Sequence, residues 1–401
     1  MHNKKQEKTR SKSRTSFKTK RPIIFTHSSR RRQIRVEKHD FKFEGNGFGY
    51  FKIWIVNIFL SILTLGIYSP WAKVRNNAYL YGSTSLNGDH FEYTAQPIRI
   101  LIGRLIVVGL YISYIIIADI MGLIEFASLF AIVIFLLVSW FIRQAIAFRM
   151  RYTRYRGINF SHRARIWDYY KFFIIHILLN LVTFFIALPY TIKEFKSLLI
   201  NNTYYGKSKL NFQAPTSQFY MIVLKYFGIS LLVAFLIFLG LAAIVGIVWV
   251  SNPEQINTIT DLINSANQDN IIESEDAISL LVFGLMGIIY GAFFIFGSFL
   301  KGFWDAWMAN AIYNNTTLEE FTPKSILDGL KLGWIYLSNF FLIIISLGLL
   351  YPYAKIRSIK YKLANISIKG ESFDSFINQN LQETRALGEE AADFFDFDIG
   401  I

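Results

Sequence analysis

Long apolar stretches constrain the fold of this chain more than any other feature. They cover residues 50–68, 98–118, 126–142, 169–188, 219–250, 277–300 and 330–350. Most reach the length of about 20 residues that a helix needs to cross a hydrocarbon core. Charged residues make up only 17% of the chain, against about 25% in ordinary soluble domains. The sequence therefore predicts an all-α polytopic membrane protein, a helical bundle, in which Gly284, Gly287, Gly291 and Gly297 allow close helix contact.

An internal repeat organises these stretches. Residues 48–93 align without gaps onto residues 330–375, and Asn, Gly, Pro, Lys, Arg and Tyr stay in register. The shared helix-end motif consists of Gly66, Pro70, Lys73 and Arg75 in the first copy and Gly348, Pro352, Lys355 and Arg357 in the last. A third, weaker copy surrounds Asn180 and Pro189. We place the repeats at about 41–97, 168–218 and 330–375.

Each copy has the same physical interpretation. An apolar helix ends near a glycine, a proline stops it, and a short basic segment follows. The next residues alternate in polarity around a turn signal, Asn87-Gly88 in the first copy and Lys369-Gly370 in the last. Because such dipeptides favour two-residue turns, we expect small β-hairpins that cap the repeat helices on the aqueous side.

The charge is concentrated at the ends of the chain and in certain loops. Most of the net charge of +14 comes from the first 49 residues, which include the run 30–32. Residues 1–40 are predicted to be a disordered basic cytoplasmic arm that contacts anionic lipid, residues 41–375 the membrane domain, and residues 376–401 an acidic C-terminal tail. Nucleic acid is not expected as a partner, since neither aromatic residues nor a binding fold accompany the arm.

Loop charges bear on the topology. The connections 119–125 and 251–276 contain no Lys or Arg, whereas the loops after the repeat helices are basic. Seven simple crossings would place basic segments on both sides of the membrane, against the positive-inside rule. Every loop fits if the three repeat helices are re-entrant and the other four stretches form two crossing hairpins, with bends at Leu65-Gly66 and Leu347-Gly348. Seven spans with a tolerated charge violation remain the alternative.

Several motifs resemble one family. They are F-x-G-x-G-x-G-Y-F from Phe43, T-L-G-I-Y-S-P-W-A-K-V-R from Thr64, and the acidic, aromatic ending over 386–400. From about Phe41 onward the chain is similar to the YjgN-like family of bacterial inner-membrane proteins, built on domain of unknown function 898. The resemblance implies a multi-pass protein of the bacterial inner (cytoplasmic) membrane. It implies no reaction, and the long basic arm departs from the family pattern.

The candidate site residues are polar groups within or near the apolar helices, where they are costly unless they face protein or water. They are Asn57, Arg104, His176, Lys301, Asp305 and Asn339. Asn57 and Asn339 occupy one repeat position and either bond across helices or line a shared binding site. Lys301 and Asp305 are spaced to pair on one helix face, and His176 is more often a helix-bonding group than a proton relay.

Two functions remain open. The first is a transporter or channel for a small solute, which gains support if Asn57, Arg104, Asp305 and Asn339 converge on one polar cavity. The alternative is a non-catalytic scaffold or envelope-associated factor that recruits lipid or protein partners or forms a homo-oligomer. No catalytic or metal-binding motif is present in the sequence, so neither an enzyme nor a cofactor is expected. Both termini are predicted to be cytoplasmic.

Overall fold

The computed structural model describes residues 37–251, 271–370, 373–378 and 380. The arm predicted over residues 1–40 lies outside this range except for its last four residues, and the tail from residue 381 lies outside it. The helices are α1 (Gly47–Leu63), α2 (Ser69–Gly82), α3 (Pro97–Ile115), α4 (Ile124–Arg151), α5 (Ile166–Val182), α6 (Leu188–Asn201), α7 (Thr216–Ser251), α9 (Ile271–Tyr313), α10 (Gly329–Ile345) and α11 (Tyr351–Ala364), with a π-helical turn η1 (Ile116–Ile120) after α3.

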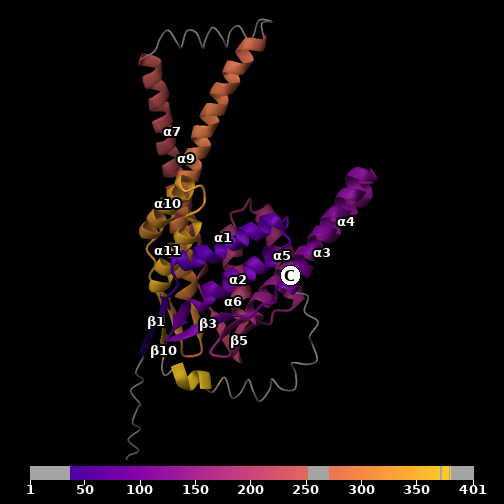
Figure 1. Ribbon diagram of the computed structural model, residues 1–401, viewed down its shortest axis with the longest axis vertical. Helices are drawn as coiled ribbons and strands as arrows, with labels where there is room; N and C mark the ends of the chain where they lie inside the picture. The colour runs from indigo at the N-terminus through magenta and orange to yellow at the C-terminus, as the bar shows by residue number, and fades with distance from the viewer. Residues whose placement is uncertain (1–36, 252–270, 371–372, 379, 381–401) are drawn as a thin grey trace, which may run out of the picture. The chain divides into compact units, whose positions relative to one another are not determined.

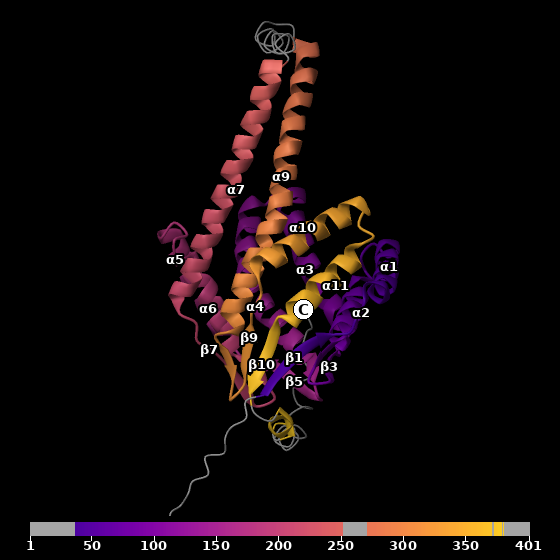
Figure 2. The same cartoon turned by 90° about the vertical axis from the view of Figure 1, so that its left-hand side faces the viewer.

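The strands are short and join into a single antiparallel sheet. They are β1 (Glu37–Phe43), β2 (Thr84–Leu86), β3 (Asp89–Tyr93), β4 (Thr153–Tyr155), β5 (Ile158–His162), β6 (Thr203–Tyr205), β7 (Ser208–Phe212), β8 (Thr316–Leu318), β9 (Thr322–Ser325) and β10 (Ile366–Gly370). Their order is β8-β7-β6-β5-β4-β3-β2-β1-β10-β9. A bridge between Leu318 of β8 and Phe321, the residue before β9, brings the two outermost strands together, so the sheet is a nearly closed ring at one end of the helices (Figures 1 and 2).

This sheet overturns the predicted fold class. An all-α bundle with separate capping hairpins is wrong, because ten strands pair into one layer. The turn at Asn87-Gly88 is present, with φ of 53° and 89°. The turn predicted at Lys369-Gly370 is wrong, since both residues belong to β10, which pairs with β1 and β9. Strands of three to seven residues carry too little periodicity to be recognised when their partners are distant in sequence.

The described chain contains five similar units rather than three. Each consists of a helix, two strands and a second helix, in the order α2-β2-β3-α3, α4-β4-β5-α5, α6-β6-β7-α7, α9-β8-β9-α10 and α11-β10-β1-α1. The two strands of a unit pair with each other in all but the fourth unit, where the bridge between Leu318 and Phe321 takes the place of strand pairing. In the first four units the strand pair begins with a threonine whose hydroxyl donates to the carbonyl four residues earlier, at 2.9, 2.9, 2.8 and 2.7 Å from Thr84, Thr153, Thr203 and Thr316. The fifth unit takes its second strand, β1, from the other end of the chain.

The three repeat helices double back through a shared turn. Between α1 and α2, the Tyr68 amide donates to the Thr64 hydroxyl at 2.9 Å, and the Gly66 amide donates to the Ser61 carbonyl at 2.7 Å. Leu65 and Gly66 have φ of 50° and 90°. The left-handed conformation suits glycine and ends the helix at once.

The other two copies repeat this turn. Leu347 and Gly348 again have φ of 50° and 90° between α10 and α11. Between α5 and α6, Phe184 and Phe185 take these places with φ of 47° and 64°, and a left-handed non-glycine residue costs about 1 kcal/mol. The bends predicted at Leu65-Gly66 and Leu347-Gly348 are thus where the chain reverses, and Pro70, Pro189 and Pro352 lie in the first turn of each returning helix.

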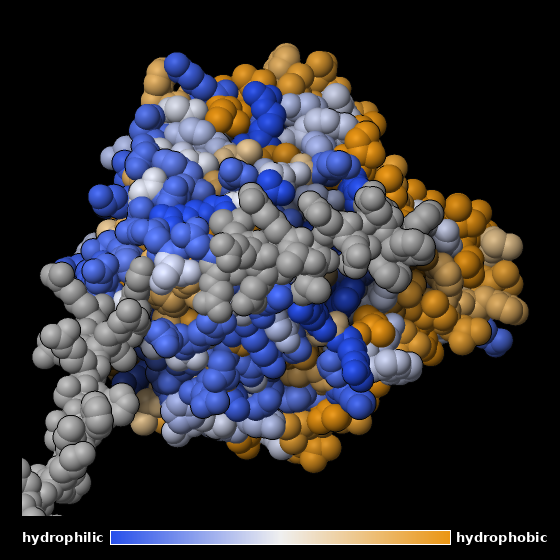
Figure 3. Space-filling model, turned by 90° about the horizontal axis from the view of Figure 1, so that it is seen from below, coloured by the Kyte–Doolittle hydropathy of each residue, from blue (hydrophilic) through white to orange (hydrophobic). Residues whose placement is uncertain are grey.

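Within the residues that the structure describes, four helices are long and apolar enough to cross a membrane. They cover Pro97–Ile120, Ile124–Arg151, Thr216–Ala243 and Met286–Tyr313, and they correspond to the four stretches predicted to cross. The first two join at residues 121–123, whereas the connection at 252–270 lies outside the described residues. Seen from the sheet end, the surface is mostly hydrophilic, and hydrophobic residues gather on the side where Figure 1 places α3 and α4 (Figure 3).

The interior of the sheet ring is filled by large side chains. Leu86, Tyr155 and Tyr205 occupy the same place in successive units and are almost fully buried. The Tyr205 hydroxyl donates to the Tyr155 carbonyl at 3.0 Å, and the Tyr155 hydroxyl donates to the Leu86 carbonyl at 2.7 Å. Neighbouring units are therefore joined by side-chain bonds as well as by strand pairing.

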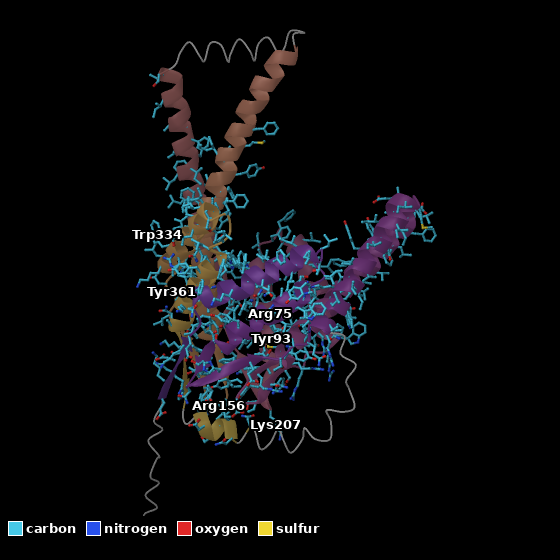
Figure 4. All side chains as sticks on the ribbon, viewed as in Figure 1. Arg75, Tyr93, Arg156, Lys207, Trp334 and Tyr361 are labelled. Carbon is cyan, nitrogen blue, oxygen red and sulfur yellow. The ribbon has the colours of Figure 1, made fainter. Side chains whose placement is uncertain are left out.

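A short helix over residues 373–378 packs on this interior from the chain's C-terminal side. Phe373, Phe376 and Ile377 contact the ring core. Arg156, at the sheet end in Figure 4, pairs with both Asp89 and Asp374. Burial lowers the pKa of Arg156, but hydrogen bonds from its guanidinium to the two carboxylates outweigh burial, and the net shift is upward. The ring core is thus closed on this side.

Glycines bring α9 and α10 into close contact. A Cβ on Gly302 would collide with the backbone of Gly333, and one on Gly329 would meet Phe303. The glycines predicted for close helix contact, Gly284, Gly287, Gly291 and Gly297, have no heavy atom within 4 Å of such a Cβ. That prediction is wrong for the described residues, because α9 packs closely only near its C-terminal half.

Candidate functional site

A chamber of about 830 Å³ lies between the helices and the sheet ring. Helices α2, α4, α6, α9 and α11 each contribute wall residues, as do β1, β3 and β10. These are the helices that lead into the strand pair of each unit. Most of the wall is apolar or aromatic, including Phe41, Phe91, Trp304 and Tyr313. The volume lies within the range of about 300–1,000 Å³ that ligand sites occupy.

Four charged side chains also line the chamber. They are Arg149 from α4, Lys196 from α6, Asp305 from α9 and Lys362 from α11. Three are cationic and one is anionic, so the chamber is positive overall. An apolar wall with a few placed charges is typical of sites that bind an amphiphilic molecule.

Asp305 is held in a network that joins three helices. It accepts from Lys301 of its own helix at 3.2 Å, from Lys362 of α11 at 3.0 Å and from the Tyr336 hydroxyl of α10 at 2.6 Å. Its side chain is 19% exposed. Asp305 thereby neutralises Lys362, and the network links α9 to the returning helix of the last hairpin.

Arg104 lies at a second cluster of cations. Its guanidinium donates to the Ser69 hydroxyl at the start of α2. Lys73, one turn later on α2, lies near both Arg104 and Arg149. Beneath them, Val74, Ile100 and Phe148 pack in one hydrophobic cluster, so α2, α3 and α4 hold these three cations in place.

Asn57 and Asn339 each bond within their own helical hairpin. The Asn57 side-chain Nδ2 donates to the Asn76 side-chain Oδ1 at 3.1 Å, and the Asn339 Nδ2 donates to the Ser358 hydroxyl at 2.9 Å. His176 lies seven residues before its turn, as both asparagines do, and its ring stacks on Tyr190 of the returning helix. These side chains therefore hold the two helices of each hairpin together. The four polar residues expected to converge on one cavity do not do so: they are Asn57, Arg104, Asp305 and Asn339.

Three further motif residues also make hydrogen bonds: Arg357 within its hairpin, Lys355 to another helix, and Arg75 to the start of its own helix. Arg357 donates to the Ser338 hydroxyl at 2.7 Å and to the Asn339 carbonyl oxygen at 3.3 Å. Lys355 donates to the Tyr50 hydroxyl of α1 at 3.1 Å. Arg75, labelled in Figure 4, donates to the Tyr68 hydroxyl at 3.0 Å.

Equivalent hydrogen bonds from a backbone amide to a tyrosine hydroxyl fix where the first and last hairpins begin. The Asn46 amide donates to the Tyr79 hydroxyl at 3.1 Å, and the Asp328 amide donates to the Tyr361 hydroxyl at 3.2 Å. Both Asn46 and Asp328 cap the following helix with their side chains. Arg75 and Tyr361 are well apart from the sheet-end residues Arg156 and Lys207 (Figure 4).

Of the charged residues that line the chamber, the sequence predicted only Asp305 as a site residue. Arg149 and Lys362 each lie four residues before the first residue of a strand pair, and Lys196 lies seven before Thr203. Threonine followed by a glycine turn, as at Thr153 and Gly157, could have revealed the extra units. Among the described residues, no group of three or more His, Asp or Glu is placed to hold a metal ion.

Comparisons with known proteins agree with this architecture of long apolar helices. Residues 38–394 match the family described as a bacterial protein of unknown function (DUF898). The inner membrane protein YjgN of Escherichia coli O157:H7 is 33% identical over 133 residues, which are 32% of this chain and 32% of that protein. The protein of the same name from Escherichia coli strain K12 is 32% identical over 133 residues, again 32% of each chain.

A third relative matches over a longer stretch. Inner membrane protein YjgN of Salmonella typhimurium strain LT2 is 30% identical over 216 residues, or 52% of this chain and 45% of that protein. The chain therefore spans between about a third and a half of the length of the curated relatives it matches. No solved structure matches it. Since the family match covers most of its length, the chain belongs to the DUF898 family of bacterial proteins of unknown function.

Proposed function

We propose that this protein is a non-catalytic protein of the bacterial inner membrane that holds an amphiphilic molecule from the bilayer in the chamber between its helices and its sheet. The names of its relatives and its four long apolar helices support the location. The chamber itself carries the proposal, because about 830 Å³ of mostly apolar space containing three cations suits a molecule with a tail and a polar head.

The proposed orientation follows from strand pairing. Neither a strand pair nor an irregular connection can be stable in the hydrocarbon core with its backbone exposed to lipid. Because all strand pairs join one sheet, all of them belong on one side of the membrane. The basic loops favour the cytoplasmic side. The hairpins α1–α2, α5–α6 and α10–α11 then enter the membrane and return, with the exposed Leu65, Phe184 and Leu347 at their tips.

Transport of a small solute has less support. The polar residues that favoured it, Asn57 and Asn339, each bond inside a hairpin, and Arg104 bonds to Ser69. Only Asp305 of the four candidates lines the chamber. Recruitment of partners by the arm or by the tail remains a prediction, because those segments lie outside the described residues.

The proposal is tested by filling the chamber. Ala309 lines it, and Ala309→Phe puts a ring into the space that the ligand would occupy. The protein is purified in mild detergent and analysed by native mass spectrometry for co-purifying lipids. We expect the wild-type protein to retain one or two lipid molecules and Ala309→Phe to lose most of them.

The matched control is Ala243→Phe on the exposed surface of α7. This variant adds the same ring at a lipid-facing position and should keep the wild-type lipid complement. Equal retention by all three proteins, or a wild-type protein that carries no lipid, would contradict the proposal.

A further inference from the structure

Two equivalent junctions between units of the ring differ in charge, because the same place in the unit is anionic at one junction and cationic at the other. Asp305 lies eleven residues before Thr316, and Lys362 of the following unit lies four residues before Ile366. These two side chains form an ion pair at 3.0 Å between adjacent units. The pair therefore marks a specific junction between one leading helix and the next.

The corresponding junction between the first two units carries two cations. Lys73 lies eleven residues before Thr84, and Arg149 lies four residues before Thr153. Lysine thus replaces aspartate at the first place, while the second place stays cationic. Arg104 adds a third positive charge beside Lys73.

These cations have no anion to neutralise them in the described part of the chain. Neither the Lys73 ammonium nor the Arg149 guanidinium has a hydrogen-bond or ion-pair partner there, and the charges that act on Lys73 are those of Arg104 and Arg149. Both side chains are exposed, and Arg149 faces the chamber. Val74, Ile100 and Phe148 are packed together, so the helices cannot easily move the like charges apart.

We infer that Lys73, Arg104 and Arg149 bind the phosphate of an acidic phospholipid headgroup, which takes the place that the Asp305 carboxylate holds at the equivalent junction. This inference rests on the proposed chamber function and names its ligand class. A phosphate oxygen accepts charge-assisted hydrogen bonds from Lys and Arg. The acyl chains would lie along the exposed apolar side chains that α3 presents next to Arg104, among them Ile102 and Leu105.

The decisive variant is Lys73→Asp, because it recreates the arrangement of Asp305 and Lys362 at the cationic junction. The new carboxylate pairs with Arg149 and competes with the phosphate. We expect binding of phosphatidylglycerol to weaken by about tenfold or more, with an unchanged or raised melting temperature. If the variant keeps its melting temperature, weaker lipid binding is due to the lost site and not to unfolding.

Binding is measured by native mass spectrometry on delipidated protein titrated with phosphatidylglycerol or with phosphatidylcholine of the same chain length. The wild-type protein should prefer phosphatidylglycerol, and Arg149→Gln should reduce that preference. Lys225→Gln, which removes an exposed cation from α7, is the matched control and should leave the preference unchanged. Inorganic phosphate should compete weakly, since it lacks the acyl chains.

The possible results separate the two proposals. If both lipids bind the wild-type protein equally, or if Lys73→Asp keeps the preference for phosphatidylglycerol, the headgroup site is wrong while the chamber proposal stands. If inorganic phosphate displaces the lipid at equal concentration, the site recognises a soluble phosphate, and the lipid assignment fails. If neither lipid binds and Ala309→Phe changes nothing, the chamber function itself is wrong.

Discussion

At the scale of single residues, His162 shows how the sheet depends on a neutral imidazole. It lies on β5 with 6% of its surface exposed. The Thr203 hydroxyl donates to the Leu199 carbonyl, so its oxygen accepts from His162 Nδ1 at 3.5 Å. Nε2 is then unprotonated and accepts from the Tyr169 hydroxyl at 2.8 Å. Adding a proton to Nε2 would reverse this hydrogen bond and place a positive charge in a buried position near Arg143, which is unfavourable.

This geometry predicts an acid-sensitive fold. Burial, together with the nearby Arg143 charge, lowers the pKa of His162 to about 4, whereas an unfolded histidine titrates near pH 6.5. As pH falls below about 6.5 the unfolded state takes up a proton and the folded state does not, so stability declines until about pH 4. We expect a loss of about 2 kcal/mol between pH 7.5 and pH 5 from this residue.

The measurement is the melting temperature in detergent across that pH range. His162→Gln keeps a hydrogen-bonding side chain but cannot titrate, so its melting temperature should fall less on acidification than that of the wild-type protein. Equal slopes for the two proteins would show that His162 does not control the acid response.

Local chemistry decides which residues can be predicted from sequence. Gly66, Gly348, Pro70 and Pro352 follow rules of helix ends that operate within a few residues. The cations of the chamber are different. Arg149 is one basic residue among many in its segment, and only the junction between units gives it a distinct environment.

At the scale of elements, α9 and α10 can pack closely because the residues at their contact are glycines, which have no side chain. Gly302 and Gly333 meet backbone to backbone, and a methyl group there has only main-chain atoms to displace. We expect Gly302→Ala to destabilise the protein by about 1–3 kcal/mol, the usual cost of overpacking a tight contact. Because Asp305 lies one turn away, its bond to Tyr336 should weaken as well.

Thermal unfolding in detergent measures this effect. Gly291→Ala on the same helix is the control, since no heavy atom lies within 4 Å of its added methyl group. It should leave the melting temperature nearly unchanged. A similar decrease for both variants would mean that the cost arises from helix flexibility rather than from contact with α10.

Apart from the hairpin around Asn87-Gly88, the strands are the elements that the sequence does not predict. β4 has three residues, and its neighbours in the sheet are β3 and β5. Pairing energy gathered across ten such strands stabilises the sheet, whereas none has the periodic pattern that identifies a longer strand. The long apolar helices, by contrast, carry their signal within one window.

At the scale of the whole described chain, the ring requires every strand pair to lie on one side of the membrane. This arrangement gives a direct test, because the chain contains no cysteine and any introduced thiol is unique. His90→Cys on β3 and Lys209→Cys on β7 should both react with a membrane-impermeant maleimide in inside-out vesicles and not in intact spheroplasts. Met121→Cys, between η1 and α4, should show the reverse.

Seven alternating crossings predict another pattern. In that case His90 and Lys209 would lie on opposite sides of the membrane, and one of the two thiols would react in spheroplasts. Such a result would also exclude the single sheet, since β3 and β7 could not share it.

Ring closure by β1 and β10 has a consequence for synthesis of the chain. Ribosomes make β1 first, but its partner β10 appears only after α11 is complete. Until then β1 and β9, the two strands between which β10 lies, are free edges of an open sheet, although every long apolar helix has already been translated. A nascent chain can therefore insert its helices one by one, but its sheet ring becomes whole only in a final step. We expect a chain truncated before residue 366 to be recognised and degraded as unfinished, which a pulse-chase measurement of its lifetime would test.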